Sequence, residues 1–394
     1  MNVPKRILPV IVFSQFCCTS LWFASNGVMN DLVVNFQLEA NALGNLTAAV
    51  QFGFISGTLL FALLTIADRF SPSKVFLVSA LFGALFNVGV IWEGNSLTSL
   101  LSFRFFTGFF LAGIYPVGMK IAADYYDKGL GKSLGFLVGA LVVGTAFPHL
   151  LKGFTETLPW RLVMIITSCL AVIGGLLMFI LVPNGPYQKL SQKLDFSAFF
   201  KVFNNRNFRS AAFGYFGHMW ELYAFWAFVP VILTTYNAAH PESQLNIPVL
   251  SFLTIAVGGI ACVIGGYLSL KIGIKRTAYA ALFLSCLCCI VSPLIFFIDS
   301  TIIVIGFLLF WGMAVIADSP LFSTLVANNS SAELKGTALT IVNCIGFSIT
   351  IISIQLLTIL RDVMNPMYIY IILALGPILG LIALYEKKKL QPVE

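Results

Sequence analysis

The chain carries very little charge for its length. Only 10% of its 394 residues are Asp, Glu, Lys or Arg, whereas an ordinary soluble domain has about 25%. Hydrophobic residues make up 59% of the sequence, and the mean hydropathy is +0.94. So few charged residues could not cover the surface of a soluble protein. The composition therefore predicts an integral membrane protein with many spans.

Motifs of common enzymes and metal sites are also missing. The sequence has neither H-E-x-x-H nor G-x-S-x-G, and its eight cysteines all lie in apolar runs. Gly131-Lys132-Ser133 imitates the end of a phosphate-binding loop, but Tyr126 stands where the first glycine would be. The basic residues are scattered singly, unlike those of a nucleic-acid-binding surface. We therefore expect no enzyme activity, cofactor, metal ion or nucleic-acid partner.

What the chain does have is a series of long apolar runs. A helix needs about 20 mostly apolar residues to span a bilayer. The runs do not alternate polar and apolar residues as the strands of a membrane β-barrel do. They predict twelve spanning helices, at residues 7–36, 42–67, 74–93, 97–121, 133–155, 159–182, 208–236, 248–270, 277–298, 301–326, 337–360 and 367–385.

The distribution of Lys and Arg predicts the orientation of these helices. If the N-terminus is cytoplasmic, all but four of the 23 Lys and Arg fall in cytoplasmic segments. Lys152, Arg161 and Arg361 then lie outside, and Arg104 lies within a span. This pattern obeys the positive-inside rule, so we expect both termini in the cytoplasm. His149 and His240 lie at or beyond outer span ends, where we expect them to be in water.

Two similar basic turns indicate a duplication. Residues 68–74 read Asp-Arg-Phe-Ser-Pro-Ser-Lys and residues 270–276 read Leu-Lys-Ile-Gly-Ile-Lys-Arg, with Lys271 placed 202 positions after Arg69. Each turn joins two apolar runs, which is typical of a two-lobed transporter. We predict a six-helix lobe at 1–182, a cytoplasmic linker at 183–207, and a second six-helix lobe with a short basic tail at 208–394.

The predicted linker has aromatic residues spaced along one helix face, with lysines beside them. This pattern favours a short amphipathic helix on the inner membrane surface. The alternative is a disordered linker in which the aromatic spacing arose by chance. The residues concerned are Phe196, Phe199, Phe200 and Phe203, with Lys193 and Lys201.

These features resemble the major facilitator superfamily. Its signature loop between spans two and three has the form G-x-x-x-D-R-x-G-R-R, and Asp68, Arg69 and Lys74 match it here. Leu64 and Ser71 replace its glycines. The second turn lacks the acid, because Leu270 stands there, but it keeps the other matching residues, which are Gly266, Lys271, Gly273, Lys275 and Arg276.

The resemblance implies an all-α protein of twelve helices in two pseudo-symmetric lobes. It also implies that the two turns form a cytoplasmic gate, in which Asp68, Arg69, Lys271, Lys275 and Arg276 stabilise closure of the inner side. Arg104 and Gly108 match a further family pattern in span four. The G-x-x-x-G-P-x-x-G-G pattern of drug–proton antiporters is absent from span five, which makes the efflux-pump interpretation less favoured.

The family arranges spans one, four, seven and ten around a central cavity, and each of these spans has a polar or aromatic stripe here. In span seven, the helical period places Tyr215, His218 and Glu221 within one arc. The other stripes contain Gln15, Thr19, Trp22 and Asn26 in span one, Arg104, Gly108, Leu111 and Tyr115 in span four, and Trp311 and Asp318 in span ten.

Ionisable groups inside a membrane are functional candidates, because each charge costs roughly 2.5–3.5 kcal/mol there. Arg104 suits a carboxylate or other oxyanion, although it could instead brace backbone carbonyls. His218, Glu221 and Asp318 are candidates for proton coupling. Alternatively, Glu221 forms a structural pair with His218 or with the neighbouring lobe, and Asp318 lies in water at the inner mouth or pairs with Lys120.

The predicted substrate contacts combine polar and aromatic side chains of the four stripes. They are Gln15, Trp22, Asn26, Arg104, Tyr115, Tyr215, His218 and Trp311.

The sequence therefore predicts a secondary transporter that works by alternating access. We favour proton-coupled uptake of a small anionic solute, because Arg104 is the only permanent cation deep in a span. The alternative is proton-antiport efflux of amphipathic or cationic compounds, and a transporter-shaped receptor is a third possibility. We expect a monomer in the bilayer of a bacterial cytoplasmic membrane.

Overall fold

The computed structural model describes residues 4–39, 41–126, 130–154, 159–187, 202–331 and 334–385, with the backbone alone at 130–132. All regular structure within these ranges is helical, as expected from the apolar runs. The helices of the first half are α1 (Ile7–Thr19), α2 (Ala24–Gly27), α3 (Met29–Phe36), α4 (Ala42–Leu63), α5 (Ile66–Arg69), α6 (Pro72–Gly89), α7 (Leu97–Leu111), α8 (Tyr115–Tyr125), α9 (Leu130–Gly153) and α10 (Trp160–Leu181).

The second half of the chain contains longer helices and two short 3-10 segments. Its elements are α12 (Arg206–Ala239), α13 (Ile247–Ile272), α14 (Ile274–Val291), η1 (Ser292–Phe297), α15 (Thr301–Ala317), α16 (Ser319–Asn328), α17 (Lys335–Val363), η2 (Ile369–Ala374) and α18 (Leu375–Leu384).

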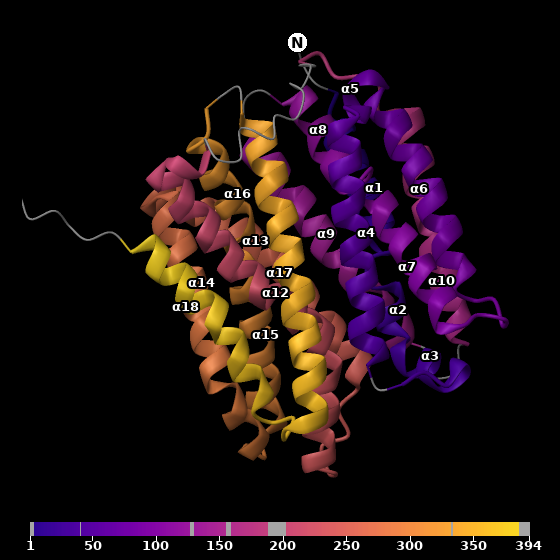
Figure 1. The fold of residues 1–394 in the computed structure, drawn as a ribbon, viewed down its shortest axis with the longest axis vertical. Helices are drawn as coiled ribbons and strands as arrows, with labels where there is room; N and C mark the ends of the chain where they lie inside the picture. Colours follow the sequence, from indigo (N-terminus) through magenta and orange to yellow (C-terminus); the bar gives the residue numbers. More distant parts are fainter. Residues whose placement is uncertain are drawn as a thin grey trace, which may run out of the picture.

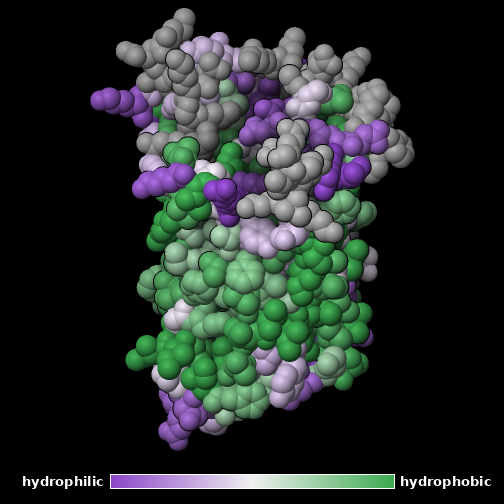
Figure 2. Space-filling model, turned by 90° about the vertical axis from the view of Figure 1, so that its left-hand side faces the viewer, coloured by the Kyte–Doolittle hydropathy of each residue, from purple (hydrophilic) through white to green (hydrophobic). Residues whose placement is uncertain are grey.

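The helices are long and apolar enough for a membrane protein. Among the described residues, ten helical stretches could cross a bilayer by length and composition, and shorter apolar stretches occupy Ile7–Thr19 and Ile369–Leu384. Those two stretches lie where the first and last spans are predicted. Figure 2 shows a broad apolar band across the face that it views, with hydrophilic residues gathered toward the two ends. The count of twelve spans and the orientation of the termini stay predictions.

The helices form two bundles that lie side by side. Figure 1 shows the indigo and purple helices of the first half on one side and the orange and yellow helices of the second half on the other. Helices α9 and α13 pack together across the seam, as do α4 and α17, and Gln355 Nε2 donates to Asn45 Oδ1 at 3.2 Å. Most of the predicted linker helix lies outside the described residues, so the three-part division stays a prediction.

Close packing of α4 against α7 depends on glycine. A Cβ atom added to Gly53 would lie 1.9 Å from the Phe105 carbonyl oxygen, and one added to Gly108 would lie 2.0 Å from that of Val50. The two backbones therefore touch, as small residues allow in membrane bundles. This contact fixes α7, and with it the side chain of Arg104, against the rest of the first bundle.

Three of the four predicted cavity helices are interrupted near their middles. The first is broken at residues 20–23 between α1 and α2, and the fourth at 112–114 between α7 and α8. The tenth is broken at Asp318, between α15 and α16. By contrast, α12 continues through Pro230 for 34 residues. Interrupted helices expose backbone groups at membrane depth, and in transporters they often form binding sites.

The prediction that His149 is solvated was wrong. Helix α9 continues to Gly153, and His149 is only 2% exposed. A Cβ atom added to Gly27 of α2 would lie 2.9 Å from Pro148, so α2 packs against α9 beside this histidine. Farther along α9, Lys152 Nζ bonds Asp31 Oδ2 at 2.9 Å. His240 does lie at the end of α12, where it is partly exposed and stacks on Tyr236.

Candidate functional site

In the first bundle, the interruption between α1 and α2 is held by Arg104. Its Nη2 atom donates to the carbonyl oxygens of Leu21 at 3.1 Å and Trp22 at 2.6 Å, and its Nη1 atom donates to Asn87 Oδ1 at 3.0 Å. Breaking a helix frees such carbonyls, and an unpaired polar group in a membrane interior is costly. Arg104 therefore satisfies the backbone that the break exposes, which matches the bracing alternative.

Arg104 is also a buried charge whose partners are all neutral. The side chain is 1% exposed, its Nε atom has no hydrogen-bond partner, and no carboxylate pairs with it among the described residues. Asn87 is fixed in turn, because its Nδ2 atom donates to Thr167 Oγ1 at 3.1 Å and Ser168 Oγ at 3.0 Å. The positive charge is thus held rigidly in place without being neutralised.

The other predicted polar residues of the first bundle differ in how many of their side-chain polar atoms have a hydrogen-bond partner. Gln15 is completely buried, and neither of its side-chain amide atoms has a partner. It packs against α8, since a Cβ atom added to Gly118 would lie 2.3 Å from Gln15 Oε1. Asn26 donates to Thr47 Oγ1 at 2.8 Å, and half-buried Tyr115 begins α8 directly after the break. Gln15 therefore retains the largest unused hydrogen-bonding capacity of these three.

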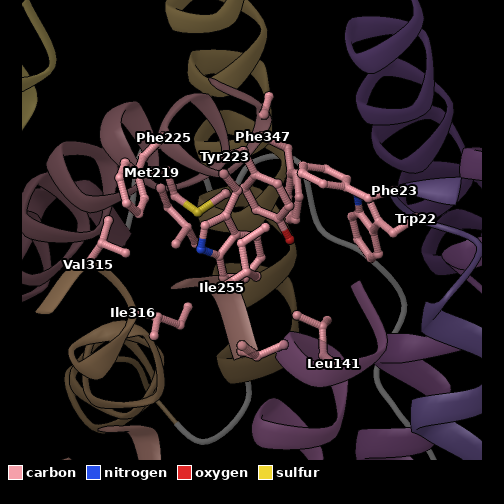
Figure 3. Packing of buried hydrophobic residues seen from close by; sticks show 14 of the residues in the cluster. Trp22, Phe23, Leu141, Met219, Tyr223, Phe225, Ile255, Val315, Ile316 and Phe347 are labelled. Atoms are coloured by element: carbon pink, nitrogen blue, oxygen red, sulfur yellow. The ribbon is translucent and has the colours of Figure 1, made fainter. Parts of the chain in front are cut away.

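An aromatic box, defined here as Trp22, Phe54, Tyr223 and Phe347, joins the two bundles. The Trp22 ring lies 4.8 Å from that of Phe54, and it stacks on Tyr223 and Phe347 with centroids 5.8 Å away. Figure 3 shows Trp22 reaching from the first half of the chain toward Tyr223 and Phe347 of the second. The Trp22 Nε1 atom is buried without a partner. The box therefore offers apolar faces and one unused donor at the seam.

In the second bundle, His218 pairs with Asp318. His218 Nδ1 of α12 lies 2.8 Å from Asp318 Oδ1 at the α15–α16 break, and both side chains are at most 1% exposed. His218 Nε2 and Asp318 Oδ2 have no hydrogen-bond partner. Asp318 is thus neither in water nor paired with Lys120, which bonds Asp68 instead. The pair retains one titratable nitrogen and one carboxylate oxygen for another ligand or proton.

Glu221 lies one helical turn from His218 but has different partners. Trp311 Nε1 donates to Glu221 Oε1 at 2.7 Å, and Ser285 Oγ donates to Oε2. The Trp311 ring lies against Phe225, with centroids 4.3 Å apart. The alternative that pairs Glu221 with His218 is therefore not met. The indole N–H of Trp311 is therefore used by Glu221 and is not left for a solute.

Tyr215 lies on the same polar face of α12, nearer to the N-terminal end of the helix. It is buried, and its ring lies 6.0 Å from that of His218. A Cβ atom added to Gly346 of α17 would lie 2.6 Å from Tyr215 Cε1, so the Tyr215 ring packs against α17. Tyr215 therefore lies between the ionisable pair and the seam.

Among the predicted gating residues, the structure gives an ion pair for Asp68. Asp68 Oδ1 bonds Lys120 Nζ at 2.9 Å, which ties the turn after α4 to α8 within one bundle. Arg69, Lys271 and Arg276 are exposed, and Lys275 is partly buried. Their role in closing the inner side stays a prediction.

Several residues of the site had no distinguishing signal in the sequence. Phe54 and Phe347 are two of 37 phenylalanines, and Ser285 and Asn87 are polar residues with apolar neighbours, of which the spans contain several. Gln51 of α4 is completely buried with both amide atoms unpartnered, and this polar residue within an apolar run could have been found. No three His, Cys, Asp or Glu side chains within the described ranges are placed to hold a metal ion.

Comparison with known proteins identifies the class of protein that this fold represents. The model of the Major Facilitator Superfamily matches residues 11–354, so the chain belongs to this family of transporters. The nucleoside transporter NupG, solved as a point mutant, aligns with 96% of this chain and 98% of its own at a TM-score of 0.72 and 14% identity. A bacterial homologue of the human lysosomal transporter Spinster, solved inward-facing and occupied, aligns with 98% of this chain and 96% of its own at 0.69 and 15%.

Two curated proteins are similar over part of the sequence. The niacin transporter NiaP of Acinetobacter baylyi is 33% identical over 176 residues, which are 38% of each chain. An uncharacterized transporter of Schizosaccharomyces pombe is 25% identical over 169 residues, which are 39% of this chain and 33% of its own. The matches thus span 38% of the first relative's length and 33% of the second's.

Proposed function

We propose that this protein is a secondary transporter of the bacterial cytoplasmic membrane that takes up a small anionic solute together with protons. Two lobes would rock around a site between Arg104, the aromatic box and the His218–Asp318 pair. The observation that carries the proposal is that Arg104 of the first bundle has only neutral partners, whereas Glu221, Asp318 and His218 are buried together in the second bundle.

Charge balance explains why an anion would move with a proton. With both acids ionised and His218 protonated, the four groups have a net charge of zero. An anion entering this site adds one negative charge, which is expensive in a low-dielectric interior. One proton taken up with it by Glu221 or Asp318 restores neutrality. Anion and proton would therefore cross together, in either direction that their gradients favour.

The unused polar atoms support the same proposal. His218 Nε2 and Trp22 Nε1 have no partner and can donate to a carboxylate, while Gln15 has an amide that could bond a second polar group. The aromatic box would cover the apolar part of the solute. The partial similarity to a niacin transporter favours a small carboxylic acid, since niacin carries a carboxyl group on an aromatic ring.

Transport into liposomes tests the proposal. Purified protein is reconstituted, the outside is made acidic, and small carboxylates including niacin are screened beside cationic dyes. We expect carboxylate accumulation that disappears when a protonophore collapses the gradient. Arg104→Met should abolish it, and Glu221→Gln should lose acceleration by the gradient while Glu242→Gln, at an exposed position, behaves as wild type.

The efflux alternative has its own signature. The aromatic box together with Glu221 could hold an amphipathic cation, since aromatic faces attract cations. Dye extrusion driven by the gradient, lost in Glu221→Gln and kept in Arg104→Lys, would overturn the uptake proposal. If no carboxylate and no dye moves under any gradient, transport of either class is excluded.

A further inference from the structure

A basic pocket lies apart from the central site, where three helices of the second bundle end or begin. It has a volume of about 200 Å³ and lies between the start of α12, the start of α14 and the end of α18. Arg206, Arg209 and Lys275 line it, and none of its lining residues within the described ranges is acidic. Three positive charges around one cavity are unusual in a chain with so little charge.

Local interactions fix the shape of this pocket. Ser210 Oγ donates to the carbonyl oxygen of Ala383 at 2.7 Å, which ties α12 to the end of α18. A single residue, Gly273, joins α13 to α14. Its φ of 93° is an angle that residues other than glycine rarely adopt. This tight turn sets Lys275 in the first turn of α14. The backbone positions of the lining residues are therefore set by the packing of α12 against α18 and by the turn before α14.

The rim of the pocket is aromatic and faces outward. Phe213 is 49% exposed and Tyr385 is 67% exposed, and both line the cavity. Figure 2 views the side on which Figure 1 places α14 and α18, and there hydrophilic residues meet the edge of the apolar band. Aromatic side chains favour this interfacial depth. Basic side chains beside exposed aromatic ones are the combination expected where phospholipid headgroups meet their acyl chains.

We propose that this pocket binds the phosphate headgroup of an anionic phospholipid, with an acyl chain lying along Phe213. Basic pockets between helices on the cytoplasmic side bind such headgroups, because the charges attract phosphate and the apolar rim holds the chain. Arg209 Nη1 already donates to the Phe203 carbonyl oxygen at 3.0 Å, which orients its guanidinium and leaves other donors for phosphate. This site is independent of the transported solute.

The test measures lipid binding to the purified full-length protein by native mass spectrometry. The probes are short-chain phosphatidylglycerol, the matching phosphatidylcholine and inorganic phosphate. We expect phosphatidylglycerol to bind about tenfold more tightly than phosphatidylcholine, and the double variant R206Q/R209Q to lose that preference. Arg276→Gln, one residue from Lys275 but not lining the pocket, should keep it.

Folding is checked separately by the thermal unfolding of each variant without added lipid, and the single variants R206Q and R209Q should each lose part of the preference. An unchanged preference in R206Q/R209Q would overturn the proposal. So would an equal loss in Arg276→Gln, which would indicate general surface attraction. Displacement of the lipid by millimolar inorganic phosphate would show a site for a free anion and not for a lipid.

Discussion

Replacing Arg104 by methionine removes every hydrogen bond that this side chain donates to the break between α1 and α2. Two backbone carbonyls and the Asn87 amide oxygen then lose their donor. Hydrogen bonds inside membrane proteins contribute about 0.6 kcal/mol on average and at most about 1.7 kcal/mol, so three of them are worth about 2–5 kcal/mol. Removing a buried charge offsets part of this loss, so we expect a net destabilisation near 2 kcal/mol.

The assay is unfolding of the purified protein by titration with sodium dodecyl sulfate. Phe106→Leu is the matched control, because Phe106 lies on the same helix but is 40% exposed at the surface of the bundle. A double-mutant cycle with Asn87→Ala isolates the contact between the two side chains, and we expect a coupling of about 0.5–1.5 kcal/mol. Unchanged stability of Arg104→Met, with no coupling to Asn87, would refute the bracing role.

Two further predictions concern the first bundle. Gly108→Ala should destabilise the protein by about 1–3 kcal/mol, because the new Cβ would overlap the Val50 carbonyl oxygen. Gly306→Ala, which has open space around it, should have no effect in the same unfolding titration. Equal effects of the two substitutions would contradict the close α4–α7 packing. Asp68→Asn should slow transport by freeing α8 from the turn after α4. The swapped pair D68K/K120D should recover part of the transport rate in liposomes. No recovery in the swapped variant would argue against this ion pair.

The apolar runs and basic turns were sufficient to predict an all-helical membrane protein and its family. Both depend on local composition and spacing, which the sequence displays directly. The helix breaks were harder to foresee. Gly113 and Pro116 accompany the α7–α8 break and Pro320 follows Asp318, but residues 20–23 contain neither Gly nor Pro. That break is stabilised by Arg104, which lies more than eighty positions away.

In the candidate site too, local spacing could be predicted from the sequence, whereas contacts between distant residues could not. Helical periodicity placed Tyr215, His218 and Glu221 on one face, and all three are buried in the structure. It did not predict that His218 pairs with Asp318, because that contact depends on how α12 packs against the α15–α16 break. His149 was misplaced for a related reason, since the packing of α2 against α9 beside it is a tertiary contact.

The central claim is that solute and proton cross together through the His218–Asp318 and Glu221 groups. It is tested most directly by recording solute uptake and internal pH in the same liposomes, without an imposed pH gradient, for wild type and for Glu221→Gln. We predict that wild-type uptake of a carboxylate acidifies the interior in proportion to the solute taken up, and that Glu221→Gln exchanges solute without changing internal pH. Solute uptake by the wild type with no change in internal pH would contradict the account.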